Sequence, residues 1–442
     1  SYLARCLEEL ELNTTYINYE VVVVDVMSDV EDLEDVYAEM SEMWGERFVS
    51  TRFEQKNYSA AINHGVNIAS GDYIVVMSCF AMAVNGNWLN EMMPLLARED
   101  VGIVGSRILD DKNHVIHAGG VFGITDDVSG MFQGLDITDS GYMERAHCIQ
   151  QYSSVSSACF GIEKQTFIKA GGLCENSFSD TRYTVMDLCL TIQQQGKNVI
   201  WSPYVTLFQD KKLAEQSNGV ADYNSGREEF IVEKWSDLFT HDPFYNDNLS
   251  LRSRFFAAEV DIQRQWDPRF NLKTRVVVFP LNGSGTGQYR MIAPMQALAE
   301  RGDVELTWMP FHEFKEQPLL PTLFELMRLK PDVLYVQQML NDISYEFLKG
   351  VKQHTSINIV FSLDDLVTNL PKLSDRKKLV FRDMRSRLRK TLALCDHTIV
   401  STEPLAELCR QYTDNVTVIP NRLESQRWLN LSLPQKKAHQ KP

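Results

Sequence analysis

Acidic residues follow two apolar runs of the sequence, where they could bind a hydroxyl-rich ligand. Asp25 lies near the end of the run YEVVVVDV (19–26), and Asp364 and Asp365 directly follow the run IVFSL. Ligands of open α/β folds bind at the carboxyl ends of the strands. These carboxylates could therefore accept hydrogen bonds from a ribose or a base, and the adjacent pair could bind a divalent cation. The alternative explanation at both places is that the acidic and hydroxyl side chains cap the next helix.

A glycine-rich turn, LNGSGTGQYR, joins an apolar run to a segment of helical period. Gly285 and Gly287 would let the backbone approach an anion, and the helix amino terminus supplies free N–H groups. Tyr289 and Arg290 follow, and an arginine in the first turn could bind a phosphate or a carboxylate with two hydrogen bonds. The glycine spacing does not fit the dinucleotide-binding pattern. A flexible turn with an exposed Arg290 is the alternative.

The composition is that of a folded, acidic protein. The 442 residues include 44 Lys and Arg against 59 Asp and Glu, a net charge of −15, with 44% hydrophobic and 23% charged residues. This balance excludes disorder over most of the chain and disfavours nucleic-acid binding. The longest apolar stretch, 73–84, is too short to span a bilayer. The eight cysteines form no paired motif, so reduced thiols in a cytosolic protein are expected.

Short apolar runs alternate with helix-period segments in both halves of the chain, which predicts an α/β fold with two Rossmann-like units. The first unit should contain a mostly parallel mixed sheet. Residues 119–152 are interpreted as a long loop or insertion. The predicted organisation is a first domain at 1–209, a helical tail and linker at 210–273, a second α/β domain at 274–430 and a polar tail at 431–442.

The first 270 residues resemble the family 2 glycosyltransferases of the GT-A fold, in the group that builds bacterial surface polysaccharides. The resemblance lies in the stretches NYEVVVVD, NYSAAINHGVNIASGDYIVV, IHAGGVFG, SSACFGIEKQTFIKAGGL, MDLCLTI and HDPFYNDNLSL. The second half resembles the amino-terminal half of GT-B glycosyltransferases. That likeness lies in FPLNGSGTGQYRMIAPMQAL, PDVLYVQQ, CDHTIVSTEPLAE and VTVIPN.

The resemblance implies a role for particular residues. Asp25 would contact the nucleobase of a nucleotide sugar, and Asn57 and Asn63 would line the nucleotide pocket. The family's first strand would precede Tyr2, and the nucleotide-binding half of a GT-B enzyme would follow Asn421; neither is present in this sequence. That second half would carry most donor contacts and leave the following residues facing the cleft: Gly285, Gly287, Tyr289, Arg290, Asp364 and Asp365.

Three departures from the family pattern bear on catalysis. The family places acidic residues after its third strand, where a divalent cation bridges them to the donor diphosphate. The corresponding segment here, MSCFAM (77–82), contains no carboxylate, so no metal is expected in the first domain. Val185 stands where the family's catalytic base is expected, so that only Asp187 remains, and Gln209 replaces a histidine.

These observations predict a glycosyltransferase that acts on nucleotide-activated sugars in surface polysaccharide or glycan assembly, with a catalytically impaired first domain. The nucleotide sugar would be the donor substrate and a glycan the acceptor, and no bound cofactor is expected. The alternative is a non-catalytic glycan- or nucleotide-binding scaffold module of a larger glycosyltransferase. The expected location is cytoplasmic, with peripheral association at the inner membrane as a further option.

Overall fold

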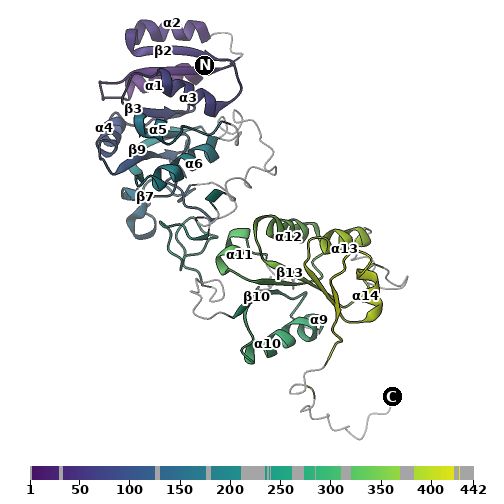
Figure 1. Ribbon diagram of the computed structural model, residues 1–442. Coiled ribbons are helices and arrows are strands. Elements are labelled where there is room, and N and C mark those ends of the chain that lie inside the picture. Colours follow the sequence, from purple (N-terminus) through teal and green to yellow (C-terminus); the bar gives the residue numbers. More distant parts are fainter. Residues whose placement is uncertain are drawn as a thin grey trace, which may run out of the picture. The chain divides into compact units, whose positions relative to one another are not determined.

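The computed structural model divides the chain into two compact units, Ser1–Val260 and Asp261–Pro442 (Figure 1). We refer to them as unit 1 and unit 2. The structure describes residues 2–28, 33–124, 130–175, 181–210, 234–235, 238, 240–260, 273–283, 285–309, 320–368, 383–422 and 428. Among the helices in these ranges, none has the length and apolar composition that a membrane-spanning segment needs.

Unit 1 contains a mixed seven-stranded sheet and a separate parallel pair of strands. The prediction of a mostly parallel sheet is wrong here: of the six strand pairings described in the seven-stranded sheet, five are antiparallel and one is parallel. The large sheet has the order β3-β8-β5-β9-β4, with β6 paired to β5 and β7 paired to β9. Its strands are β3 (Tyr73–Met77), β4 (Ala81–Ala83), β5 (Val101–Leu109), β6 (Val115–His117), β7 (Gln150–Gln151), β8 (Cys159–Glu163) and β9 (Asn198–Gln209). The parallel pair is β1 (Val21–Val26) and β2 (Phe48–Phe53).

Helices cover both faces of the large sheet. Successive side chains of a strand point to opposite faces, so neighbouring residues of the central strand β5 contact different helices. Ile103 packs with α3 and α6 on one face, and Val104 packs with α4 on the other. Both residues are fully buried, as expected for a strand covered on both sides. The helices of unit 1 are α1 (Tyr2–Leu12), α2 (Leu33–Trp44), α3 (Tyr58–Ile68), α4 (Trp88–Leu96), α5 (Lys164–Lys169) and α6 (Thr181–Gln194), with short 3₁₀ turns at Gly45–Arg47 and Tyr142–His147.

Residues 240–260 differ from the expected helical tail and linker. From residue 241 onward they form turns and one isolated bridge, between Leu249 and Ala258, and they belong to unit 1. The reason is hydrophobic burial: Tyr245 and Phe256 pack against side chains of the predicted insertion and against Trp201. The predicted insertion therefore shares a hydrophobic core with residues 240–260, separate from the two cores on the faces of the large sheet.

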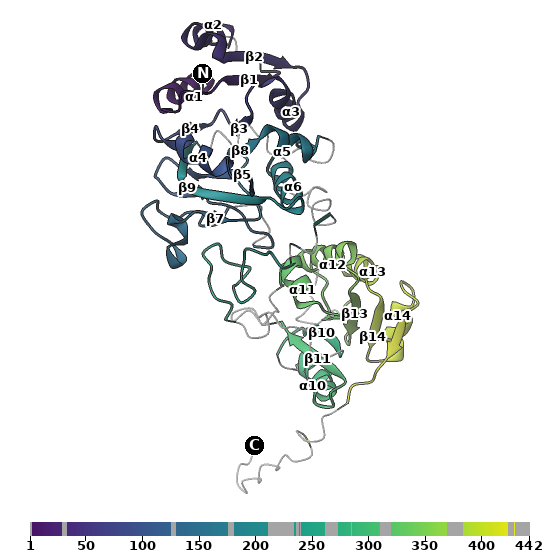
Figure 2. The ribbon, with the colours of Figure 1, turned by 60° about the vertical axis from the view of Figure 1, so that its left-hand side comes forward.

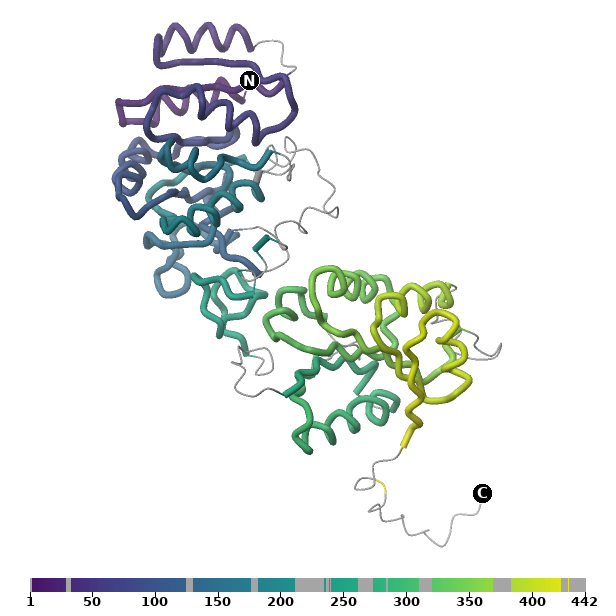
Figure 3. The backbone as a smooth tube through the Cα atoms, in the orientation of Figure 1, coloured from purple at the N-terminus to yellow at the C-terminus, as the bar shows by residue number. Residues whose placement is uncertain are grey.

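Unit 2 is built on a fully parallel six-stranded sheet of order β11-β10-β12-β13-β14-β15. The strands are β10 (Thr274–Phe279), β11 (Val304–Trp308), β12 (Val333–Gln337), β13 (Asn358–Leu363), β14 (His397–Val400) and β15 (Val416–Val418). The helices are α9 (Gly285–Gly287), α10 (Ala293–Glu300), α11 (Leu323–Leu329), α12 (Asp342–His354), α13 (Met384–Leu392) and α14 (Glu403–Cys409), with a π-helical turn at Gln288–Ile292 between α9 and α10. Figure 3 traces the alternation of strand and helix along the backbone. This confirms the predicted α/β class.

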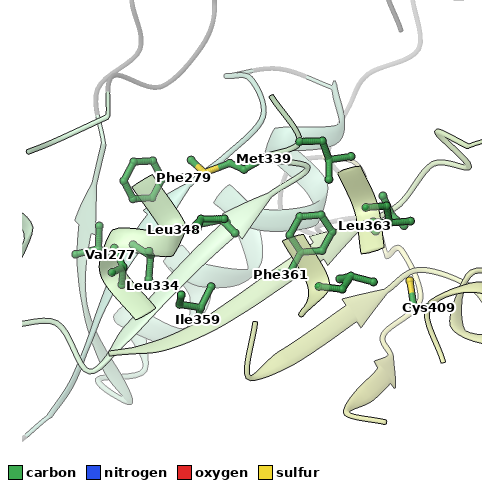
Figure 4. Close-up of a cluster of buried hydrophobic side chains, with 14 of the residues drawn as sticks. Val277, Phe279, Leu334, Met339, Leu348, Ile359, Phe361, Leu363 and Cys409 are labelled. Atoms are coloured by element: carbon green, nitrogen blue, oxygen red, sulfur yellow. The ribbon is translucent and has the colours of Figure 1, made fainter. Parts of the chain in front are cut away.

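The core of unit 2 lies between this sheet and its covering helices. Val277 and Phe279 of β10, Leu334 of β12 and Phe361 of β13 point to the same face, against Leu348 of α12 (Figure 4). All five side chains are fully buried. The strand order reverses at β10, because β11 lies on one side of it in the sheet and the next strand, β12, lies on the other side. A ligand of a doubly wound sheet binds at such a point, at the carboxyl ends of the strands.

Candidate functional site

The turn after β3 is the place where the resemblance expects metal-binding carboxylates. Ser78 N donates to Ala158 O at 2.8 Å, and Ala81 N donates to Ser78 O at 2.9 Å, so the turn is fixed to the sheet. The ring of Phe80 packs against Tyr2 of α1, with 6.2 Å between the ring centroids. In the β4–β9 pairing, Ala81 lies opposite Gln209, which therefore stands beside the turn.

Cysteine thiols surround this turn. Cys6 on α1 donates a hydrogen bond to Ala81 O at 3.3 Å, and Cys159 lies opposite Met77 in the β3–β8 pairing. Burial raises the pKa of both Cys6 and Cys159 to about 12, so both thiols stay protonated at neutral pH. Protonated thiols and a phenyl ring cannot bind a hard divalent cation. The described residues include no group of three His, Cys, Asp or Glu side chains placed to hold a metal.

Asp25 lies near the carboxyl end of β1, as the sequence predicts. Its Oδ1 accepts a hydrogen bond from Ser28 N at 3.0 Å, so this acid orders the turn that follows the strand. Arg52 is its neighbour in the β1–β2 register. Burial raises the pKa of nearby Tyr37 to about 12, and the Asp25 charge adds to that shift.

Asn57 and Asn63 both hold α3 against the segment 173–175. Asn57 caps α3, since its Oδ1 accepts from Ala60 N at 3.1 Å, and its Nδ2 donates to Glu175 O at 3.0 Å. Asn63 accepts from Leu173 N at 2.9 Å and donates to Leu173 O and to the Glu175 carboxylate, each at 2.8 Å. Both amides are thus used within unit 1, and their predicted contact with a nucleotide stays a prediction.

Asp187 on α6 is paired with two side chains from a distant part of the sequence. Its Oδ1 accepts a hydrogen bond from Trp235 Nε1 at 2.8 Å and forms an ion pair with Lys234 Nζ at 2.6 Å. Sequence reasoning missed this pair because the segment around Lys234 carries no recognisable motif. Val185, where the resemblance expects the base, is 1% exposed and packs in the core between α6 and the sheet.

The glycine-rich turn of unit 2 lies after β10, at the point where the strand order reverses. Gly285 adopts a φ of +49°, which favours glycine. A Cβ on residue 287 would stand 1.8 Å from Asn282 O, so only glycine fits there. Gly287 N donates to Asn282 Oδ1 at 3.2 Å. The turn is therefore shaped by its own backbone contacts.

Arg290 is buried rather than exposed, which corrects the alternative interpretation of this turn. Its side chain lies on the π-helical turn and is 5% exposed. Nη1 donates to Ile419 O and to Asn421 Oδ1, the latter at 3.1 Å. Its Nε and Nη2 find no hydrogen-bond partner within the described part of the chain. The Nε and Nη2 nitrogens of this buried guanidinium are therefore available to donate to another group.

Asp364 and Asp365 lie at the same carboxyl edge as Tyr289 and Arg290. Asp364 Oδ1 accepts from Gln338 Nε2 at 2.7 Å, and Asp364 O accepts from the Ser401 hydroxyl at 3.2 Å. Burial raises the pKa of Asp364, the Asp365 charge raises it further, and Arg290 opposes both effects. Burial and then both carboxylates also raise the pKa of Tyr289. Four residues that the sequence predicted therefore lie close enough for their charges to interact: Tyr289, Arg290, Asp364 and Asp365.

Gln338 and Asn421 were not predicted as members of this group. Both follow strands of the sheet, β12 and β15, so the signal that could have indicated them is a polar residue after an apolar run. Residues 366–368 after the two acids form no helix, and the described segment stops there. The predicted capping of a helix near residue 366 therefore finds no support in the described residues.

Comparison with known proteins relates the chain to glycosyltransferases. The model of the family described as Glycosyl transferase family 2 matches residues 1–117. An uncharacterized protein of Sinorhizobium fredii, y4gI, is 28% identical over 286 residues, covering 62% of this chain and 30% of that protein. The O-antigen biosynthesis protein RfbC of Myxococcus xanthus is 25% identical over 258 residues, covering 56% of this chain and 19% of that protein.

Among solved structures, the chain is similar to that of GalNAc-T7 with UDP, GalNAc and Mn²⁺, with a TM-score of 0.42 and 15% identity. The similar region covers 54% of this chain and 47% of that one. The chain spans less than a third of the length of the two curated relatives. The similarity to the Glycosyl transferase family 2 model is confined to residues 1–117, about a quarter of the chain.

Proposed function

We propose that this chain is part of a glycosyltransferase that uses nucleotide-activated sugars in the assembly of a surface polysaccharide. The observation that carries the proposal is the family 2 match over residues 1–117, which include β1, α3 and β3. The relationship to RfbC, a protein of O-antigen biosynthesis, supports the class of product. The mixed α/β sheet of unit 1 is compatible with this assignment.

In this proposal Asp25 is the nucleobase contact of unit 1. Its carboxylate is half-buried near the carboxyl end of β1, where a ligand of an α/β fold binds. Asn57 and Asn63 line the same pocket, and they hold segment 173–175 against α3. Their loss would change the shape of the pocket rather than remove a contact to the base.

Unit 1 is proposed to work without a divalent cation and to be impaired in catalysis. The turn after β3 offers Ser78, Cys79 and Phe80 where a cation needs carboxylates. A general base must accept a proton from the acceptor hydroxyl. Asp187 is held by Lys234 and Trp235, which both bind its Oδ1. The leaving diphosphate and the acceptor proton would both lack their usual partners.

Unit 2 is proposed to be the acceptor-side half of a GT-B glycosyltransferase. The support is the cluster of Tyr289, Arg290, Asp364 and Asp365 beside the glycine-rich turn, at the point where the strand order reverses. The two carboxylates suit sugar hydroxyls, and the free donors of Arg290 suit an anionic group.

A second candidate is a non-catalytic module that binds a glycan or a nucleotide, or that only scaffolds an adjacent enzyme. The ion pair of Asp187 with Lys234 favours it, because the one acid left near the expected base position is already neutralised. The two candidates differ in turnover. Only the enzyme would release free nucleoside diphosphate from a donor sugar.

Titration calorimetry of the 442-residue chain with UDP, GDP and TDP sugars tests the proposal, with and without Mn²⁺. We expect one donor to bind with an affinity that Mn²⁺ changes by less than about twofold. Asp25→Asn should weaken that binding about tenfold, the loss of roughly one hydrogen bond. The matched control is Asp35→Asn on the exposed side of α2, which should bind normally.

Binding that requires Mn²⁺ would contradict the metal-free proposal. No binding of any of these sugars would remove the nucleotide-sugar function of unit 1 altogether. Release of nucleoside diphosphate, measured in the same samples, separates the enzyme from the scaffold.

A further inference from the structure

The guanidinium of Arg290 is used along one edge only. Its Nη1 donates to Ile419 O and to Asn421 Oδ1, whereas Nε and Nη2 have no hydrogen-bond partner among the described residues. The N–H groups of Nε and Nη2 lie side by side on one edge of a guanidinium and point in the same direction. Such a fork matches the two oxygens of a carboxylate or a phosphate. The unused edge of Arg290 is therefore shaped to bind an oxyanion.

Two further buried polar groups lie on neighbouring strands at the same edge of the sheet. Gln337 is the last residue of β12, and Ser362 lies opposite it in the register with β13. Gln337 Oε1 accepts from Leu281 N at 2.9 Å, which fixes the amide. Gln337 Nε2 and Ser362 Oγ find no hydrogen-bond partner in the described part of the chain, and both side chains are buried. An acceptor placed between such groups would satisfy donors that are costly to leave unpaired.

Arg290, Gln337 and Ser362 share the face of the sheet that α10 covers, whereas α12 and α13 cover the other face (Figure 2). Side chains two residues apart on a strand point to the same face, so Gln337 and Ser362 share the face of Tyr335. Tyr335 packs with Met291, the neighbour of Arg290 on the π-helical turn. Burial raises the pKa of Tyr335, and the nearby Ser362 hydroxyl and the Arg290 charge counteract this. The unpartnered groups therefore lie around one place.

Asp364 belongs to the same group and determines its charge. Burial raises the pKa of Asp364, the Asp365 charge raises it further, and Arg290 counteracts both effects. Gln337 also lowers the pKa of Asp364, so this amide lies close to the carboxylate. The two acids carry more negative charge than the one cation offsets. A phosphate would add close to two negative charges at neutral pH, whereas a carboxylate adds one, which Arg290 alone can neutralise.

The glycine-rich turn beside Arg290 does not offer the contacts that phosphates use. Phosphates bind at free backbone N–H groups of a helix amino terminus. Gly287 N already donates to Asn282 Oδ1 at 3.2 Å, and α9 has only three residues. Oxyanion binding at this edge is therefore left to side chains, and their charge balance favours a carboxylate.

On the basis of the acceptor role proposed for unit 2, we propose that its acceptor contains a uronic acid and that Arg290 binds the carboxylate of this sugar. The fork of Nε and Nη2 binds both carboxylate oxygens, and Gln337 Nε2 and Ser362 Oγ supply further donors. Asp364 and Asp365 accept hydrogen bonds from the ring hydroxyls. Because Nε and Nη2 are covered in the free protein, binding requires a local shift of the side chains over them.

The carboxylate should decide which sugars bind. Asp365 and Gly285 are exposed at the carboxyl edge of the sheet and Asp364 is half-buried, so the sugar ring can stay at the surface. A neutral sugar could still bind the two acids, but it would leave both donors of the buried Arg290 edge unpaired. A site built for a polar group rejects an analogue that lacks this group, because its own buried groups then lose their partner.

Calorimetry of the 442-residue chain with paired glycosides tests this inference. The probes are methyl β-glucuronide against methyl β-glucoside and methyl α-galacturonide against methyl α-galactoside, at millimolar concentration. The members of each pair differ only in a carboxylate in place of a hydroxymethyl group. We expect at least one uronide to bind at least about tenfold more tightly than its neutral partner.

Two variants of Arg290 test whether the fork causes that preference. Arg290→Lys keeps the positive charge but not the two parallel donors, so the preference should fall below about threefold. Arg290→Met removes both the charge and the donors and should abolish the preference. The matched control is Arg301→Met, because the Arg301 side chain lies in the same unit and is 72% exposed. This control should keep the full preference.

A spectroscopic readout follows the fork itself. The Nε–H signal of Arg290 in a proton–nitrogen correlation spectrum is identified by its loss in Arg290→Lys. Adding the uronide should move this signal downfield, because a charged acceptor then binds the proton, and the neutral glycoside should leave it in place. An arginine with a purely structural role would show neither the shift nor the difference between the two sugars.

The possible outcomes separate this inference from the proposed function. Equal binding of uronides and neutral sugars would overturn the carboxylate contact and leave unit 2 as a sugar-binding unit. Inorganic phosphate that binds more tightly than either uronide, and that Arg290→Lys weakens, would assign the fork to phosphate and also overturn the inference. No binding of any glycoside would remove the acceptor role of unit 2 as well, while donor binding by unit 1 is measured separately.

Discussion

Asp242 joins two segments of unit 1 through a buried carboxylate. Its two oxygens accept hydrogen bonds from Phe122 N and Phe244 N, each at 2.8 Å. Burial nevertheless raises the pKa of Asp242 to about 6, because these bonds and the nearby Ser153 offset the lost hydration only in part. The folded protein therefore holds this proton more tightly than the unfolded chain does.

The raised pKa predicts a pH-dependent contribution of Asp242 to stability. The contribution is fully present below the ordinary pKa near 3.8 and is lost as pH rises through about 6, a change of about 3 kcal/mol. The free energy of unfolding of the wild type minus that of Asp242→Asn should accordingly shrink between about pH 4 and about pH 7.5. Urea unfolding at both pH values measures this difference, and a constant difference would contradict the assignment.

Arg290 allows a test of whether its guanidinium serves binding or stability. Two of its donors lack partners in the described residues, and its acceptors Ile419 and Asn421 are exposed to water. Arg290→Met should therefore change the free energy of unfolding by less than about 1 kcal/mol. Arg290→Ala should cost about 2–4 kcal/mol, because it leaves a cavity. A cost above about 3 kcal/mol for Arg290→Met, measured in urea, would assign the arginine a structural role.

Single residues also mark where sequence reasoning could not reach. The position of Asp25 followed from the apolar run before it. The burial of Val185 could not be predicted, because the sequence pattern of α6 does not indicate which of its residues pack against the sheet. For the same reason Val185→Asp would not simply restore a base, since it places a charge in a closed core. Arg290 required knowledge of the chain after β15, 129 residues away.

Helix α3 shows how one element positions a whole segment. Asn63, in its middle, makes three hydrogen bonds with Leu173 and Glu175. Asn63→Ala should lower the free energy of unfolding by about 2–3 kcal/mol, because the backbone N–H and C=O of the buried Leu173 lose their partner. Asn67→Ala, on the exposed side of the same helix, should change it by less than about 0.5 kcal/mol. Thermal and urea unfolding compare the two, and equal costs would contradict the role of Asn63.

The strands of unit 2 were predictable because each is a short apolar run followed by turn residues. The short strands β6 and β7 were not, since two or three residues carry too little pattern. Residues 240–260 were misjudged for a related reason. Their aromatic side chains have no helical or strand period, and they are ordered by packing on Trp201 and the insertion.

At the scale of the whole molecule, the chain divides into units 1 and 2, each with its own core. Residues 1–260 and 273–430 expressed as separate proteins should therefore each unfold cooperatively. Their two calorimetric transitions should add up to the trace of the full chain within error. A protein from 273–430 that fails to fold, or a single shared transition in the full chain, would contradict two independent units.

The contact of Arg290 with Ile419 has a consequence for synthesis of the chain. The arginine lies near the start of unit 2, and its acceptor is translated 129 residues later. At about 5–20 residues per second, this takes roughly 6–26 s. During that interval the guanidinium cannot find the partner that it has in the finished fold. Unit 2 thus completes its sheet only when the ribosome has passed β15, and nascent chains stopped earlier should remain clients of chaperones.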